Sequence, residues 1–209
     1  LRNTESLLNV KDFCGLFLPS KSPYGNLMLS WTELILRVEH INDLSITIKN
    51  DFEELNLNKS VDITKLYSRL KFNSEQVIYW LRKTTDELIS ILYILSYFKE
   101  NGKYPEKIKI SSIGELLNSN NNLSEKLASQ KEYLELINNI SNTYKHSIIN
   151  SQTYNHFRND SLFVIAYQLK FNNLKSPPKL HTVEFRAILL MFQEFLEEIK
   201  KNIKSLSVV

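Results

Sequence analysis

The stretch SEQVIYWLRKTTDELISILYILSYFKE, residues 74–100, decides the expected fold. Its apolar positions recur at the three- and four-residue spacing of an α-helix and form a wide face, which predicts a central bundle helix with neighbours on more than one side. Asn101-Gly102 ends the predicted helix, because a glycine readily adopts the left-handed conformation of a C-cap. The face consists of Val77, Trp80, Leu81, Thr84, Leu88, Ile89, Ile91, Leu92, Tyr93, Ile94, Leu95 and Phe98.

Other helices are predicted on both sides of this central helix. The first covers residues 30–55 and starts with a capping box, in which Ser30 accepts a bond from the helix amides and Glu33 reaches back. Asn118 to Asn122 is rich in asparagine and serine and predicts a loop. The remaining predicted helices cover residues 62–70, 113–117 (a single turn), 124–148 and 183–206.

The apolar period changes between the last two helices. Phe163, Ile165 and Tyr167 alternate with Leu162, Val164 and Ala166, which predicts a strand with one richly apolar face that continues to Leu169 and Phe171. Residues 177–183 are predicted to return as an edge strand. The expected fold is therefore mainly α, an antiparallel bundle of about five helices with a small β-hairpin before the last helix. Residues 1–29 form an N-terminal arm, and residues 30–209 form the bundle domain.

Composition limits the classes of protein to which the chain can belong. Its 209 residues, 43% hydrophobic and 23% charged, suit one globular domain. The net charge of +3 permits nucleic-acid binding without requiring it. The single cysteine excludes an intrachain disulfide and favours a reducing compartment. No apolar run reaches the roughly twenty residues of a membrane helix, so we expect no membrane contact. We also expect a cytoplasmic protein with no cofactor and no metal site.

The one local grouping that looks like a site lies in residues 138–146. An apolar stripe of this predicted helix includes Ile137, Ile140 and Tyr144, and at 100° per residue several polar side chains fall on the opposite side. Amides and a cation suit contacts with phosphate or ribose, and an imidazole can act as a general acid or base. The bland alternative is the solvated face that any surface helix has. The candidate residues are Asn138, Asn139, Asn142, Lys145 and His146, with Arg158 in the following loop.

The string Asn142-Thr143-Tyr144-Lys145-His146, together with the helical organisation over residues 30–206, resembles the HEPN superfamily of helical-bundle domains. The resemblance implies a commonly dimeric protein whose active members are metal-independent ribonucleases of toxin–antitoxin, CRISPR-associated and abortive-infection systems. It also implies that Asn142 and His146 occupy motif positions at a cleft between two copies. In this reading His146, Asn142 and Lys145 are the catalytic candidates, and Asn138, Asn139 and Arg158 bind RNA.

The chain departs from that family at Ser141, which stands where the family has an arginine. A serine cannot supply a fixed cation or a bidentate phosphate clamp, so the departure argues against catalysis. Lys145 and Arg158 are the candidates for supplying the charge instead. Two functions follow: an RNA-associated protein of a bacterial defence or toxin–antitoxin type system, or a non-catalytic helical module for protein interaction or dimerisation. Either predicts a homodimer or a partner protein.

Overall fold

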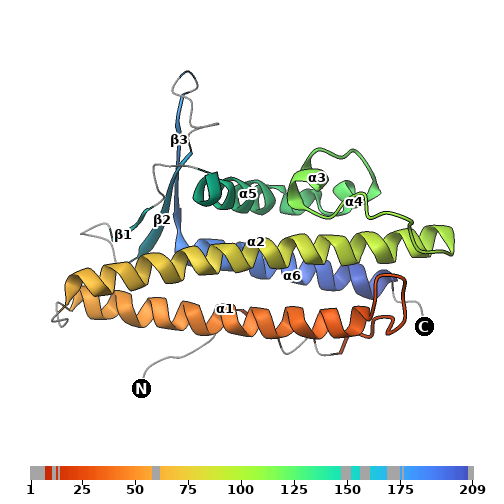
Figure 1. The fold of residues 1–209 in the computed structure, drawn as a ribbon, viewed down its shortest axis with the longest axis horizontal. Coiled ribbons are helices and arrows are strands. Elements are labelled where there is room, and N and C mark those ends of the chain that lie inside the picture. Colours follow the sequence, from red (N-terminus) through yellow and green to blue (C-terminus); the bar gives the residue numbers. More distant parts are fainter. Residues whose placement is uncertain are drawn as a thin grey trace.

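The computed structural model describes residues 8–10, 13, 15–57, 62–146, 152–155, 161–168, 175 and 177–206, without the side chains of 146 and 152–155. This part of the chain is mainly α-helical, as predicted. Helices α1 (Leu27–Asn56) and α2 (Ile63–Asn101) form a long antiparallel pair, and α5 (Lys131–His146) and α6 (Phe185–Leu206) also pack on α2 (Figure 1). The short helices α3 (Ile113–Leu117) and α4 (Asn122–Lys126) precede α5. The single helix predicted over residues 124–148 is therefore wrong, because α4 and a 3-10 turn (Ala128–Gln130) come before α5 begins at Lys131.

Helix α2 is the centre of the bundle, as its wide apolar face predicts, but it is longer than predicted. The expected break near residues 71–73 is wrong, because the helix runs without interruption from Ile63. Asp62 caps its start by accepting a hydrogen bond from the Lys65 amide at 2.9 Å. Ser74, predicted to open a new helix, is fully buried inside α2. Gly102 provides the predicted left-handed C-cap with φ 66°.

Helix α1 begins at Leu27 rather than at Ser30. Asn26 is the N-cap, and its side chain accepts a hydrogen bond from the Leu29 amide at 3.0 Å. The hydroxyl of Ser30 instead donates to the Asn26 carbonyl oxygen, so the predicted capping box is wrong. A serine–glutamate spacing alone does not select the cap when an asparagine precedes it by one turn.

The described part of residues 1–29 packs on the bundle. The indole Nε1 of Trp31 donates to the Phe13 carbonyl oxygen at 3.1 Å. The Asn42 amide pairs with both backbone groups of Leu8, at 3.0 and 2.9 Å. Leu8 and Phe13 are buried, as are Leu16 and Leu18, so this segment contributes to the apolar core beside α1.

In the described part of the chain between α5 and α6, three antiparallel strands lie in the order β1 (Gln152–Asn155), β2 (Leu162–Gln168) and β3 (Lys179–Glu184). The predicted hairpin is β2–β3, with Phe163 opposite Glu184 and Gln168 opposite Lys179. Strand β1, which was not predicted, pairs with the other edge of β2.

The more deeply buried face of β2 is the one opposite to the predicted face. Leu162, Val164 and Ala166 are buried, whereas the larger Phe163, Ile165 and Tyr167 are half-buried. The smaller side chains let α5 and α6, which both contact β2, approach the strand closely. Leu169 and Phe171 lie outside the described residues.

An aromatic cluster fixes the first half of α5 against α6. The Tyr133 ring lies 5.3 Å from the Phe195 ring and 5.9 Å from the Phe192 ring, measured between centroids. The Tyr133 hydroxyl pairs with the Thr85 hydroxyl of α2 at 2.8 Å. Burial raises the pKa of Tyr133 well above its usual value. Within the described residues, no helix has the length and apolar character needed to cross a bilayer.

Candidate functional site between α2 and α5

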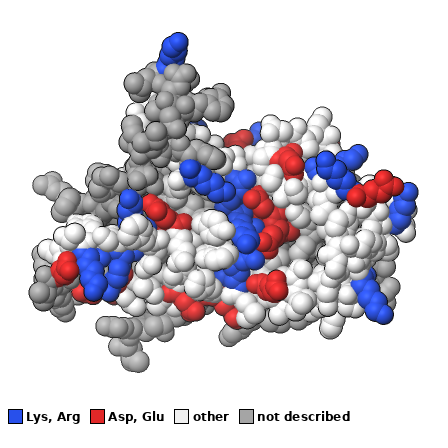
Figure 2. Space-filling model, viewed as in Figure 1, with Lys and Arg blue, Asp and Glu red and all other residues white. Residues whose placement is uncertain are grey.

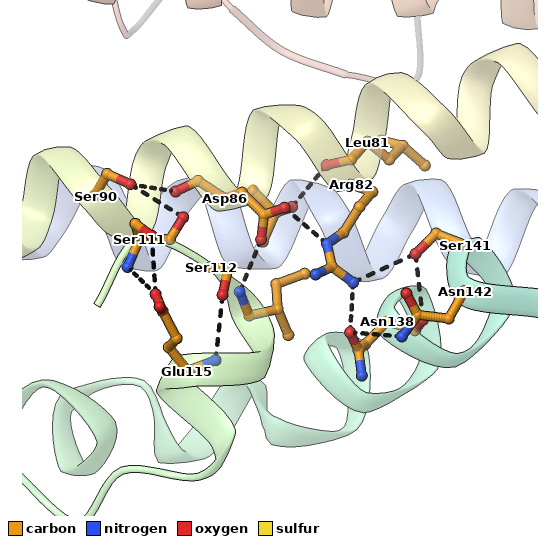
Figure 3. A network of polar contacts seen from close by, with 12 residues as sticks. Leu81, Arg82, Asp86, Ser90, Ser111, Ser112, Glu115, Asn138, Ser141 and Asn142 are labelled. Carbon is orange, nitrogen blue, oxygen red and sulfur yellow. Dashed lines mark hydrogen bonds and ion pairs between the residues drawn. The ribbon is translucent and has the colours of Figure 1, made fainter. Parts of the chain in front are cut away.

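A single arginine joins the middle of α2 to the second half of α5. The Nε of Arg82 donates to Asp86 Oδ2 at 2.8 Å, one helical turn along α2. Its Nη1 donates to Asn138 Oδ1 and, at 3.3 Å, to the Ser141 hydroxyl (Figure 3). The Arg82 side chain is only 12% exposed. A cation so far removed from water requires charged and polar partners, which these contacts supply.

The amides of α5 are ordered around this arginine. Asn138 Oδ1 accepts a second hydrogen bond, from Asn142 Nδ2 at 3.3 Å. The Ser141 hydroxyl donates to the Asn138 carbonyl oxygen at 3.2 Å. Ser141 is buried, and Asn138 and Asn142 are half-buried. The polar side of the second half of α5 is therefore joined to α2 by hydrogen bonds at Asn138 and Ser141, while Lys145 remains exposed.

Asp86 connects Arg82 to α3. Its Oδ1 accepts a hydrogen bond from the backbone amide of Ile113, the first residue of α3, at 2.7 Å. Ser112 caps the same helix through the Glu115 amide. Hydrogen bonds from the Ser111 amide and hydroxyl to the Glu115 carboxylate hold its pKa below its usual value. The Ile113 amide holds the carboxylate of Asp86, and Asp86 in turn orients the guanidinium of Arg82.

A cleft with a volume of about 390 Å³ opens beside Arg82, between α2 and α5. Lys83 and Lys145 are exposed at its rim. Its three cationic side chains face two carboxylates, so the lining has an excess of positive charge. A cleft of this size accommodates a small ligand or one nucleotide of a longer chain. The residues that line it are Glu75, Ile78, Tyr79, Arg82, Lys83, Asp86, Ser141, Tyr144 and Lys145.

The charged atoms form a visible pattern on the same face of the molecule. Figure 2 shows lysine and arginine atoms in a stripe that crosses the middle of this face, from the side of α5 over α2 toward α1. Acidic atoms lie along one side of the stripe. On α1, the largely buried Arg37 pairs with Glu87 of α2 at 2.8 Å.

The structure brings together some of the residues predicted for the site. Lys145 lines the cleft, and Asn138 and Asn142 belong to the hydrogen-bond network of Arg82. Asn139 is half-buried, and its carbonyl oxygen accepts a bond from the Thr143 hydroxyl at 2.8 Å. Its side chain does not line the cleft.

Two of the predicted residues cannot be placed. His146 is the last residue of α5 and directly follows Lys145, but its side chain lies outside the described part. Arg158 also lies outside the described residues.

Sequence reasoning missed Arg82 and Lys83, because residues 74–100 were interpreted as a core helix. A signal was nevertheless present. The pair Arg82-Lys83 stands between the largely apolar residues 77–81 and 88–98, and Asp86 follows Arg82 at the spacing of a helical ion pair. Comparison of this chain with protein-family models, with curated proteins and with solved structures finds no match. The interpretation of the site therefore depends on its own residues.

Proposed function

We propose that this protein is a HEPN-like RNA-associated protein of a bacterial defence or toxin–antitoxin type system, and that it binds RNA at the cleft between α2 and α5. One observation carries the proposal. The position where the resemblance calls for an arginine holds Ser141, and the guanidinium of Arg82 lies 3.3 Å from the Ser141 hydroxyl. A cation from another helix thus stands beside the motif position.

The chemistry of Arg82 suits a phosphate. Its Nε and Nη1 are occupied by Asp86, Asn138 and Ser141, which fix the plane of the guanidinium. Arg82 lines the cleft, so a bound phosphate there would lie beside the guanidinium. A guanidinium oriented in advance loses little conformational entropy when it binds a phosphate oxygen.

Lys83 and Lys145 add exposed positive charge at the rim of the cleft. Exposed ammonium groups attract a polyanion and release its counterions on binding, which makes such binding sensitive to salt. Asp86 offsets part of the charge of Arg82, so the two lysines determine the net attraction. We therefore expect RNA affinity to fall steeply as the salt concentration rises.

In a catalytic form of this proposal, His146 is the acid–base group. It takes the proton of a ribose 2′-hydroxyl, and the 2′-oxygen attacks the adjacent phosphorus. The bond between phosphorus and the 5′-oxygen breaks, and that oxygen leaves with a proton returned by the protonated imidazole of His146, which gives a 2′,3′-cyclic phosphate and a 5′-hydroxyl. Arg82 and Lys145 stabilise the negative charge on the phosphate during the transfer. No metal ion takes part in these steps.

The test is incubation of labelled RNA with the protein in EDTA, with binding and cleavage measured separately. We expect Arg82→Gln and Lys145→Ala to weaken binding, and His146→Ala to abolish any cleavage while leaving binding in place. Lys131→Ala is the matched control, because Lys131 is an exposed lysine at the other end of α5, paired with Glu135. Absence of RNA binding by the wild type would contradict the proposal, whereas binding without cleavage would leave an RNA-binding protein that is not a nuclease.

A second candidate function is a non-catalytic interaction or dimerisation module. It is favoured by Leu29 and Leu36, which lie seven residues apart on α1 and are 57% and 58% exposed. Two large apolar side chains on one exposed helix face are typical of a contact surface. Sedimentation of the wild type and of Leu36→Lys tests this function, which predicts self-association that the charged variant loses.

A further inference from the structure

Beside the cleft, one exposed aromatic ring is held in a fixed position. Tyr79 lines the cleft and is 47% exposed. Its ring lies 5.0 Å from that of Trp80, at an angle of 67° between the planes. An aromatic ring left so exposed gains little from the hydrophobic effect, and it offers a flat apolar surface at a low cost in conformational entropy.

Trp80 is itself clamped by charged groups. The Cζ of Arg37 lies 5.4 Å from the centroid of the Trp80 ring, and the Nζ of Lys83 lies 5.6 Å from it. The His40 ring meets it edge-on at 6.3 Å. Cations over an indole ring are attracted by its quadrupole, and these contacts hold Trp80 in place. The half-buried Trp80 is therefore a rigid support for Tyr79.

The positions of Tyr79, Arg82 and Lys83 on α2 suit one nucleotide. Residues three and four apart lie on the same helix face, about one turn of 5.4 Å from each other. All three side chains line the cleft, so the cations and the aromatic ring are within reach of the phosphate and the base of a single nucleotide. Proteins that bind single strands combine cations for the backbone with aromatic rings for the bases.

We infer that Tyr79 is a base-stacking subsite of the cleft, on which one unpaired nucleobase of a bound RNA lies while Arg82 and Lys83 hold its phosphate. The inference rests on the proposed RNA-binding function and deepens it. Stacking on Tyr79 requires a base that is not paired or stacked within a duplex. The subsite therefore selects single-stranded RNA over the same sequence in a duplex.

The chain offers a matched control for Tyr79. Phe72 lies seven residues earlier on α2 and is 62% exposed. It also has a cation beside it, with the Nζ of Lys71 5.9 Å from its ring centroid. Phe72 does not line the cleft. Its removal reports any general effect of losing an exposed aromatic ring from α2.

The first experiment measures binding of a fluorescently labelled, single-stranded 12-nucleotide RNA in EDTA by anisotropy. Tyr79→Ala is expected to bind roughly tenfold more weakly, because stacking on one aromatic ring contributes about 1–3 kcal/mol per base. Tyr79→Phe keeps the ring and is expected to match the wild type, as is Phe72→Ala. The wild type is expected to bind an abasic oligomer of the same length as weakly as Tyr79→Ala binds intact RNA.

The second experiment uses Trp80 as a reporter in the unlabelled protein. Trp31 is 1% exposed and does not line the cleft, so a change of tryptophan emission reports Trp80. RNA is expected to quench the emission of the wild type and of Tyr79→Phe, and to quench Tyr79→Ala less at equal saturation.

Two results would overturn the subsite while leaving the proposed function in place. One is equal affinity of Tyr79→Ala and the wild type for intact RNA, and the other is equal affinity of the wild type for intact and abasic RNA. Absence of any RNA binding by the wild type would overturn the proposed function, and the subsite with it. Circular dichroism and a urea transition of Tyr79→Ala verify that a weaker affinity does not come from unfolding.

Discussion

The two halves of α5 contact the rest of the bundle through different kinds of side chain. The first half is anchored by Tyr133, whose ring packs on Phe192 and Phe195 in a fully buried aromatic cluster. The second half also places Ile137 and Ile140 in the core, and the hydrogen bonds of Arg82 to Asn138 and Ser141 add a polar contact there. Aromatic packing positions the first half mainly through contact area, with one hydroxyl pair between Tyr133 and Thr85, whereas the polar contacts of the second half also fix the direction of a cation beside a cleft.

This difference identifies where function is to be sought. Replacing a largely buried ion pair with well-packed apolar residues is often neutral or stabilising. The hydrogen bonds of Arg82 to Asn138 and Ser141 are therefore not needed to hold α5, because the aromatic contacts of the first half show that apolar packing can do so. We attribute the polar contacts of the second half to the orientation of Arg82 at the cleft.

The largest expected effect would come from breaking the aromatic half. Phe192→Ala should lower the free energy of unfolding by about 3–5 kcal/mol, because it removes a fully buried ring and leaves a cavity. Urea denaturation followed by circular dichroism measures the change. Leu190→Ala, at an exposed position of the same helix, is the control and should have a much smaller effect. Similar losses for both variants would contradict the assignment of this cluster as the anchor.

A smaller effect is expected in the polar half. Arg82→Met should destabilise the protein by about 1–3 kcal/mol, because it removes the charged partner of Asp86 Oδ2 and one of the two donors to Asn138 Oδ1. The exposed pair Lys131–Glu135 supplies the control, and Lys131→Met should cost less than about 0.5 kcal/mol. If Arg82→Met were as stable as the wild type yet lost RNA binding, the hydrogen bonds of Arg82 would serve ligand recognition alone.

A third variant tests the Tyr133 hydroxyl, which is the polar group of the aromatic cluster. Tyr133→Phe removes the hydroxyl that pairs with Thr85 and should cost about 0.5–1.5 kcal/mol. The loss is limited because the Thr85 hydroxyl keeps its hydrogen bond to the Leu81 carbonyl oxygen at 2.8 Å. RNA binding should not change. Reduced RNA affinity at full folding would show that the two halves are coupled.

The smallest effect concerns the sheet that links α5 to α6. Burial, with a smaller contribution from Lys179, lowers the pKa of His181 in the folded state. The unfolded chain therefore binds more protons than the folded one as the pH falls below the ordinary histidine value of about 6.5, and the free energy of unfolding decreases there. His181→Gln should remove this part of the pH dependence. Urea transitions of both proteins at pH 5 and pH 8 measure it, and parallel profiles would contradict it.

Much of the fold follows from local patterns. The wide apolar face of residues 74–100, the cap at Gly102 and the alternation in β2 each correspond to an observed element. The wrong predictions concern positions where two neighbouring residues or two faces of an element suit the same role. Asn26 and Ser30 both favour a helix start, and only the backbone geometry selects Asn26. Either face of β2 is apolar enough for the core, and packing against two helices selects the one with smaller side chains.

The candidate site was half predictable. Helical geometry places Asn138, Asn142 and Lys145 on one sector of α5, and the sequence alone therefore identifies them as a group. It does not identify Arg82, which lies 56 residues before its partner Asn138. The sequence by itself determined that the chain is mainly helical and which helix faces are apolar, because these properties depend on neighbouring residues, although it did not place every helix boundary. Only the tertiary structure decided that the polar sector of α5 meets Arg82, because that contact depends on how two distant helices are rotated and aligned when they pack.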